Sequence, residues 1–145
     1  MVKVEHEVTI DRPPAEVFAY LTDMSKIQEW QATAIEGHLE SDRMEEGARA
    51  VEVRKFLGRN MESTLHVTTY EPDTRFVAEV VSGPVTFRVS HVLQPDESGT
   101  RVTFTIEGEP GGFFRLAEPV VERQVRRQVT DDFRTLKLRL ETRAG

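Results

Sequence analysis

The sequence contains no cysteine among its 145 residues. Disulfide bonds, a thiol nucleophile and thiolate metal ligands are therefore excluded. No apolar run approaches the roughly 20 residues that a membrane-spanning helix needs. Charged side chains at positions 3, 5 and 7 stand where a secretory signal peptide would have its apolar segment. We therefore expect a cytoplasmic protein without a membrane span.

Sequence motifs for cofactors and metal ions are also lacking. No glycine-rich phosphate loop or dinucleotide fingerprint occurs. The four histidines, at positions 6, 38, 66 and 91, show no close spacing of metal ligands. The net charge of −6 opposes general nucleic-acid binding, which relies on Lys and Arg displacing counterions from phosphates. We predict no cofactor, no metal ion and no nucleic-acid partner.

The composition is that of an ordinary globular protein, with 38% hydrophobic and 30% charged residues. The length suits one domain with a hydrophobic core of its own. Internal repeats, low-complexity tracts and linkers are not found. We predict a single domain over residues 1–145.

The N-terminal segment predicts a strand followed by two short helices. Residues 2–10 alternate between apolar and polar side chains, the two-residue period of a half-buried strand. Asp11 is expected to cap the first helix, and the two prolines after Arg12 suit its first turn. A second short helix is predicted over residues 24–30, with Trp30 at its end.

An antiparallel meander is predicted after Trp30. The breaks between its strands carry turn residues and are too short for a parallel crossover. A turn after Pro95 places His91 opposite Phe104 in the last hairpin. The first strand is expected to join the last. The predicted strands lie near residues 33–40, 48–57, 60–71, 74–82, 85–95 and 100–108, with breaks that include Gly83-Pro84.

The C-terminal part predicts one long amphipathic helix. Gly111-Gly112 is expected to separate it from the sheet, and Pro119 either starts the helix or kinks it. Its apolar residues recur at intervals of three and four. The stripe consists of Val121, Val125, Val129, Phe133, Leu136 and Leu140.

These elements predict an α+β fold in which a curved seven-stranded antiparallel sheet wraps around the long C-terminal helix. A twisted sheet of this width curls around whatever covers its apolar face. One helix, roughly 10 Å wide with its side chains, is too narrow to fill the concave surface. We therefore expect a cavity between the sheet, the long helix and the two short helices.

The pattern from Val8 to Phe18 followed by Trp30, the hairpin from Leu93 to Val102 and the final helix resemble the START-like, or helix-grip, superfamily. The most similar branch is the polyketide cyclase/dehydrase and lipid-transport group. The resemblance spans essentially the whole chain and implies a START-like ligand-binding domain with an apolar cavity. Members include lipid carriers and aromatic cyclases without a common catalytic motif, so the resemblance assigns no catalytic residue.

The cavity is predicted to be lined by apolar side chains with a few polar ones. Histidine in such a place either binds a ligand and transfers protons or is a core residue with a backbone partner. Trp30 either lines the mouth of the cavity or packs at a helix end. The candidate ligand-binding residues are His91, His6, Trp30, Phe87, Phe104, Ser63, Leu65, Val125, Gln128 and Val129.

Three further predictions concern side chains near this region. Tyr70 falls on the outward-facing set of its strand and is expected on the surface. Asp132, together with its neighbour Asp131, is expected to flank the apolar stripe. Arg49 shares a strand face with the valines at 51 and 53, so it either reaches an anionic ligand group at the rim or lies on the surface.

The sequence favours a protein that binds a hydrophobic small molecule, lipid-like or aromatic and polyketide-like. One alternative is a cyclase or dehydratase in which a cavity histidine acts as acid or base. Another is an interaction module that uses the basic C-terminal helix, since eight basic and five acidic residues follow position 111. The sequence itself gives no firm evidence of catalysis.

Overall fold

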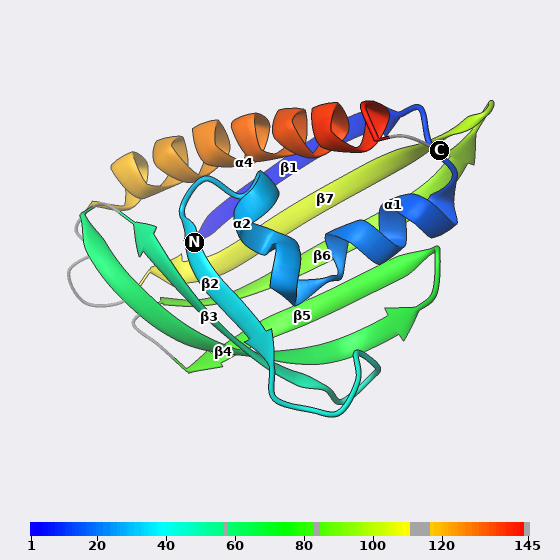
Figure 1. The fold of residues 1–145 in the computed structure, drawn as a ribbon. Helices are drawn as coiled ribbons and strands as arrows, with labels where there is room; N and C mark the ends of the chain where they lie inside the picture. Colours follow the sequence, from blue (N-terminus) through cyan, green and yellow to red (C-terminus); the bar gives the residue numbers. More distant parts are fainter. Residues whose placement is uncertain (57, 83–84, 111–116, 144–145) are drawn as a thin grey trace.

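A computed structural model describes residues 1–56, 58–82, 85–110 and 117–143. Over these residues, seven strands form one curved antiparallel sheet, and the helices lie on one of its faces (Figure 1). This is the predicted helix-grip arrangement. The elements are β1 (Val2–Ile10), α1 (Pro14–Leu21), the 3-10 helix η1 (Met24–Lys26), α2 (Ile27–Trp30), β2 (Ala34–Leu39), β3 (Arg49–Phe56), β4 (Arg59–Glu71), β5 (Arg75–Ser82), β6 (Val85–Asp96), β7 (Gly99–Pro110) and α4 (Glu118–Glu141).

The sheet is a meander closed by its first strand. Its order is β1-β7-β6-β5-β4-β3-β2, so β1 pairs with β7 as predicted. The predicted register of the last hairpin is confirmed, because His91 lies opposite Phe104. The predicted breaks at Gly83-Pro84 and Gly111-Gly112 lie outside the described residues.

The cap of α1 differs from the prediction. Its N-cap residue is Pro13, and Asp11 makes no capping hydrogen bond. The Asp11 carboxylate instead accepts a hydrogen bond from Ser98 Oγ at 3.3 Å. Asp23 caps η1, since its Oδ1 accepts a hydrogen bond from the backbone N–H of Ser25 at 3.0 Å.

The short helices η1 and α2 lie close against β2 because Gly37 has no side chain. A Cβ atom at Gly37 would lie 2.5 Å from Ile27 Cδ1 and 3.1 Å from the carbonyl oxygen of Met24. This close packing holds Trp30 and the following Gln31 over the concave face of the sheet.

The prediction that Tyr70 lies on the outer surface is wrong. The register of β4 against β5 shifts between Val67 and Thr69, so one extra residue enters β4 there. Such a bulge reverses the alternation of faces beyond it. Tyr70 therefore turns inward, where its ring packs edge-on against Phe18 at a centroid distance of 5.4 Å.

Helix α4 begins at Glu118, so Pro119 lies in its first turn, where a missing N–H costs little. The helix runs alongside β1 (Figure 1). Phe133, Leu136 and Leu140, in its C-terminal half, are buried. Of the helices in the described part of the chain, none is both long enough and apolar enough to cross a membrane.

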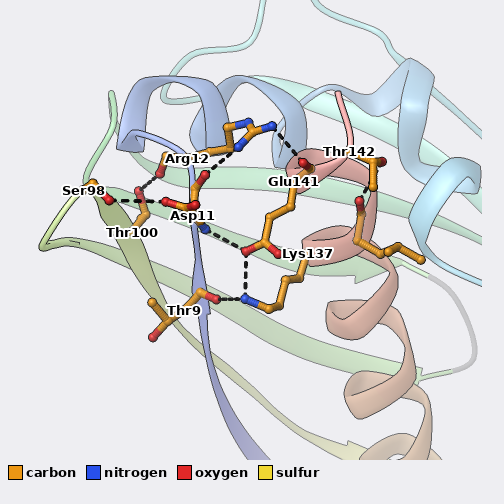
Figure 2. Close-up of polar contacts among 9 residues, drawn as sticks. Thr9, Asp11, Arg12, Ser98, Thr100, Lys137, Glu141 and Thr142 are labelled. Carbon is orange, nitrogen blue, oxygen red and sulfur yellow. Dashed lines mark hydrogen bonds and ion pairs between the residues drawn. The ribbon is translucent and has the colours of Figure 1, made fainter. Parts of the chain in front are cut away.

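The C-terminal end of α4 is tied to the turn between β1 and α1 (Figure 2). The Arg12 guanidinium donates to the backbone carbonyl of Glu141, the last residue of α4, at 2.8 Å and to that of Arg143, just beyond the helix, at 3.1 Å. Carbonyl groups at the end of a helix find no N–H partner within it. The backbone carbonyl of Arg12 accepts from Thr100 Oγ1 at 2.7 Å. Lys137 joins the same group by donating to Glu141 Oε2 at 2.8 Å. We call Arg12, Thr100, Lys137 and Glu141 the junction.

Replacing Arg12 with glutamine tests whether the junction stabilises the fold. Hydrogen bonds from a charged donor contribute about 1.5–3 kcal/mol, and half-buried Arg12 makes two to the helix end. We expect Arg12→Gln to lower the free energy of unfolding by about 1–2 kcal/mol in urea denaturation. The control is Arg126→Gln, which removes one exposed ion pair with Glu122 and should change stability by less than about 0.5 kcal/mol. Equal effects of the two substitutions would contradict the assignment.

Candidate ligand-binding site

A cavity of about 180 Å³ lies between the concave face of the sheet, the stretch of α4 from Val121 to Phe133 and the pair η1 and α2. Lining side chains come from β1 at Val2, from η1 at Met24, from β4 at Met61 and from α4 at Val121. An apolar cavity of about 150 Å³ can hold benzene. The space therefore suits a ligand of about one or two rings.

The structure brings most of the candidate residues together. Trp30, Leu65, Phe87, His91, Phe104, Val125, Gln128 and Val129 all line the cavity. Among the described residues, His6 and Ser63 do not line it. The His6 ring packs against Phe133 at a centroid distance of 5.7 Å, and Ser63 is buried within β4. A role for any of these residues in ligand binding stays a prediction.

Aromatic rings form one wall of the cavity around His91. The His91 ring lies 4.9 Å from Phe104, 5.7 Å from Phe76 and 6.3 Å from Phe133, measured between centroids. Trp30 packs edge-on against Phe133 at 5.5 Å from the other side. These rings give a ligand flat apolar surfaces to pack against.

His91 is neutral at physiological pH. Burial lowers the pKa of its ring to about 4, against a small opposing effect of the Phe76 carbonyl. That carbonyl oxygen lies 3.3 Å from His91 Nδ1 and can only accept, so Nδ1 carries the proton. The other ring nitrogen, Nε2, is then an acceptor.

An ion pair on β3 that the hydrophobic pattern of the sequence does not predict forms the polar side of the cavity. Glu52 and Arg54 both line the cavity, with side chains 6% and 17% exposed. Alternation along β3 places their side chains on the inner face with Ala50. Arg49 therefore lies on the outer face with the valines at 51 and 53, and it is exposed. This excludes Arg49 from the cavity wall.

Arg54 has a protein acceptor for each of its guanidinium nitrogens. Its Nε and Nη2 atoms donate to the two carboxylate oxygens of Glu52 at 3.1 and 3.0 Å. Nη1 donates to Thr33 Oγ1 at 3.1 Å, and Nη2 also donates to Gln31 Oε1 at 2.7 Å. Gln128 Nε2 reaches the same Thr33 hydroxyl from α4 at 2.6 Å. This network joins β3 to the end of α2 and to α4.

The prediction that Asp132 flanks the apolar stripe is wrong. Asp132 is 6% exposed, lines the cavity and accepts a hydrogen bond at 3.0 Å from the backbone N–H of Ala32. Burial raises the pKa of its carboxyl to about 6, although that hydrogen bond and the charge of Arg54 oppose the rise. The Asp132 carboxyl is therefore half protonated near pH 6 and mostly ionised at pH 7.

Two buried polar atoms next to this network lack a partner. Trp30 Nε1 and Gln128 Oε1 have no hydrogen-bond partner among the described residues. Unpaired buried polar atoms are costly and uncommon in folded proteins. Both residues line the cavity, so a ligand or a water molecule bound there is the natural source of partners.

Solved structures with the same fold support this architecture. The chain matches the TTHA0849 protein from Thermus thermophilus with a TM-score of 0.83 and 19% identity, covering 95% of this chain and 96% of that one. A conserved protein from Geobacillus kaustophilus matches with a TM-score of 0.79, 16% identity and coverage of 96% and 95%. A START superfamily protein from Mycobacterium smegmatis matches with a TM-score of 0.78, 13% identity and coverage of 96% and 97%. At sequence identities this low, the structural matches show a shared fold alone.

The sequence itself shows the family. No curated protein matches the chain. The sequence profile of the family described as "Polyketide cyclase / dehydrase and lipid transport" matches residues 1–141, nearly the full length. The chain therefore belongs to the polyketide cyclase/dehydrase and lipid transport family.

Proposed function

We propose that this protein, as one ligand-binding domain over residues 1–145, binds a small hydrophobic molecule in the cavity between the sheet and α4. The observation that carries the proposal is the cavity itself, about 180 Å³ of space lined by aromatic and aliphatic side chains with a polar network at one side. Ligand sites commonly combine a mostly apolar wall with a few convergent polar groups. Family membership supports the same function.

The size of the cavity narrows the ligand. Long-chain lipids need far more room than about 180 Å³, whereas one or two rings fit. The rings of Phe76, Phe104 and Phe133 lie together at the cavity wall. An aromatic or polyketide-like ligand therefore fits better than an extended acyl chain.

Filling the cavity with a larger side chain should strongly weaken ligand binding. Val129 lines it from α4 and is 7% exposed, so Val129→Phe adds a ring to the space that the ligand would occupy. We expect the variant to bind naphthalene at least tenfold more weakly than the wild type, as measured by isothermal titration calorimetry.

The matched control is Val120→Phe, which adds the same ring at an exposed position of the same helix. It should bind naphthalene as the wild type does. If Val129→Phe remains folded by circular dichroism and its affinity is unchanged, the cavity is not the binding site. Native mass spectrometry of freshly purified protein adds a second measurement, because a ligand that co-purifies would identify the natural class.

A second candidate function is proton transfer within the cavity. A general acid or base works best when its pKa lies near the working pH. The Asp132 carboxyl, with its pKa of about 6, meets this condition, whereas the His91 ring, with its pKa of about 4, is a weak base and is scarcely protonated at pH 7. These two pKa values favour Asp132 over the cavity histidine for the acid–base role.

The pKa of Asp132 predicts how stability changes with pH. Its carboxyl pKa is about 6 in the folded state and 3.8 ordinarily. Between these values the folded state binds more protons than the unfolded state, so its contribution to stability is lost as pH rises. As pH rises from about 4 to about 7, the free energy of unfolding of Asp132→Asn, measured by urea denaturation, should therefore increase by about 2 kcal/mol relative to that of the wild type. The neighbouring exposed Asp131→Asn should show no such trend, and a flat difference for Asp132→Asn would exclude the raised pKa.

The Kemp elimination of 5-nitrobenzisoxazole tests the proton-transfer candidate. In this reaction a base takes the ring C–H proton, the N–O bond breaks, and its electron pair goes to the oxygen of a cyanophenolate product. We expect the protein to accelerate it with an apparent pKa of about 6. Asp132→Asn should lower the rate at least about tenfold, and Asp131→Asn should not. Activity that survives Asp132→Asn would refute the candidate, while leaving the binding function untouched.

A further inference from the structure

Three polar side chains of the cavity provide hydrogen-bond acceptors. His91 presents Nε2 as an acceptor because its Nδ1 proton is held by the Phe76 carbonyl. Gln128 keeps its Oε1 acceptor unpaired among the described residues, because its amide nitrogen is bound to Thr33. Asp132 adds a carboxylate, which can accept several hydrogen bonds. Acceptors therefore come from both walls, β6 and α4.

The donors of the cavity are largely used by the protein. Arg54 is the one Lys or Arg side chain among the described lining residues, and its guanidinium nitrogens are already bound to Glu52, Gln31 and Thr33. Among the fully buried side-chain donors of the described residues, Trp30 Nε1 has no partner. The described lining thus offers acceptors on two walls, and its one cationic side chain is already paired with Glu52.

The formal charge of the lining points the same way. Glu52 and Asp132 bring two carboxyl groups, while Arg54 brings one positive charge that already lies 3.0 Å from Glu52. A carboxylate ligand would add a further negative charge in an apolar space without a free cation to pair with it. Buried like charges raise the free energy strongly. An uncharged hydroxyl group instead donates to an acceptor and, with its own oxygen, can accept from Trp30.

We propose that the cavity selects small aromatic molecules that carry a hydroxyl group, phenols in particular, and rejects the corresponding carboxylates. The ring packs among Phe76, Phe104 and Phe133, and the hydroxyl group donates its hydrogen bond to the acceptors of α4, Gln128 and Asp132. This inference rests on the proposed binding function and goes beyond it by naming the chemical class of the ligand.

Three probes with one skeleton test the inference. Propylbenzene, 4-propylphenol and 4-propylbenzoate differ at a single ring position, and each is titrated into the wild-type protein by calorimetry at about pH 8, where Asp132 is ionised. We expect 4-propylphenol to bind about tenfold more tightly than propylbenzene, the effect of one net hydrogen bond. The benzoate should bind at least tenfold more weakly than the phenol.

The outcomes separate the two proposals. If propylbenzene binds and the benzoate binds as tightly as the phenol, the cavity is a ligand site but the inference about its polarity is wrong. If the folded protein binds none of the three probes, the proposed function fails and the inference fails with it.

Substitutions on α4 locate the effect. Asp132→Asn removes the negative charge and keeps the acceptor for the Ala32 N–H. It should therefore reduce the ratio of the affinities for 4-propylphenol and 4-propylbenzoate at least threefold. Gln128→Leu should weaken the binding of 4-propylphenol and leave the affinity for propylbenzene unchanged. Asp131→Asn, the exposed neighbour on the same helix, is the matched control and should preserve the selectivity of the wild type. Unchanged selectivity in both folded cavity variants would overturn the assignment of these two residues.

Discussion

The position of α4 across the concave sheet is the constraint on which the site depends. Its C-terminal half is held by burial of Phe133, Leu136 and Leu140, and its end is fixed by the junction with Arg12. Its N-terminal half carries the same apolar stripe, but the sheet curves away beneath it and leaves the cavity. One amphipathic helix thus does two things along its length. Toward its C-terminus it completes the core, and from Val121 to Phe133 it forms a wall of the cavity that includes Gln128 and Asp132.

The polar network is expensive to bury, and its geometry explains how the fold tolerates it. A buried ion pair offsets the loss of hydration only when hydrogen bonds satisfy the remaining polar atoms. Arg54 meets this condition through Glu52, Gln31 and Thr33. Packing of α2 on Gly37 supplies two of these partners, because it brings the segment after Trp30 next to β3. The close approach of a short helix to an edge strand therefore also completes the polar side of the cavity.

The sequence predicted the fold well because strand alternation, turn residues and helix periodicity are local signals. The pairing of His91 with Phe104 followed from the turn length. For Trp30 the sequence left two alternatives open, lining the cavity or packing at the end of a short helix. One misplaced residue and one missed ion pair both concern the faces of strands. An extra residue in β4 reversed the face of Tyr70, and β3 turns Glu52 and Arg54 inward although Val51 and Val53 are more apolar. A pattern of hydrophobicity cannot predict an inward ion pair, because its partners come from distant positions in the chain.

Asp132 shows the same difficulty on a helix, since a carboxylate beside an apolar stripe normally faces solvent. Its burial depends on the backbone N–H of Ala32, which lies one hundred positions earlier in the chain. The fold alone therefore does not determine the chemistry of the cavity. Proteins that share this fold at 13–19% identity share the sheet and the long helix, whereas charge and hydrogen-bonding capacity depend on a few side chains on β3, β6 and α4. In the proposed function, the ligand preference of this chain depends on Glu52, Arg54 and Asp132, whose charges favour a neutral donor over an anion.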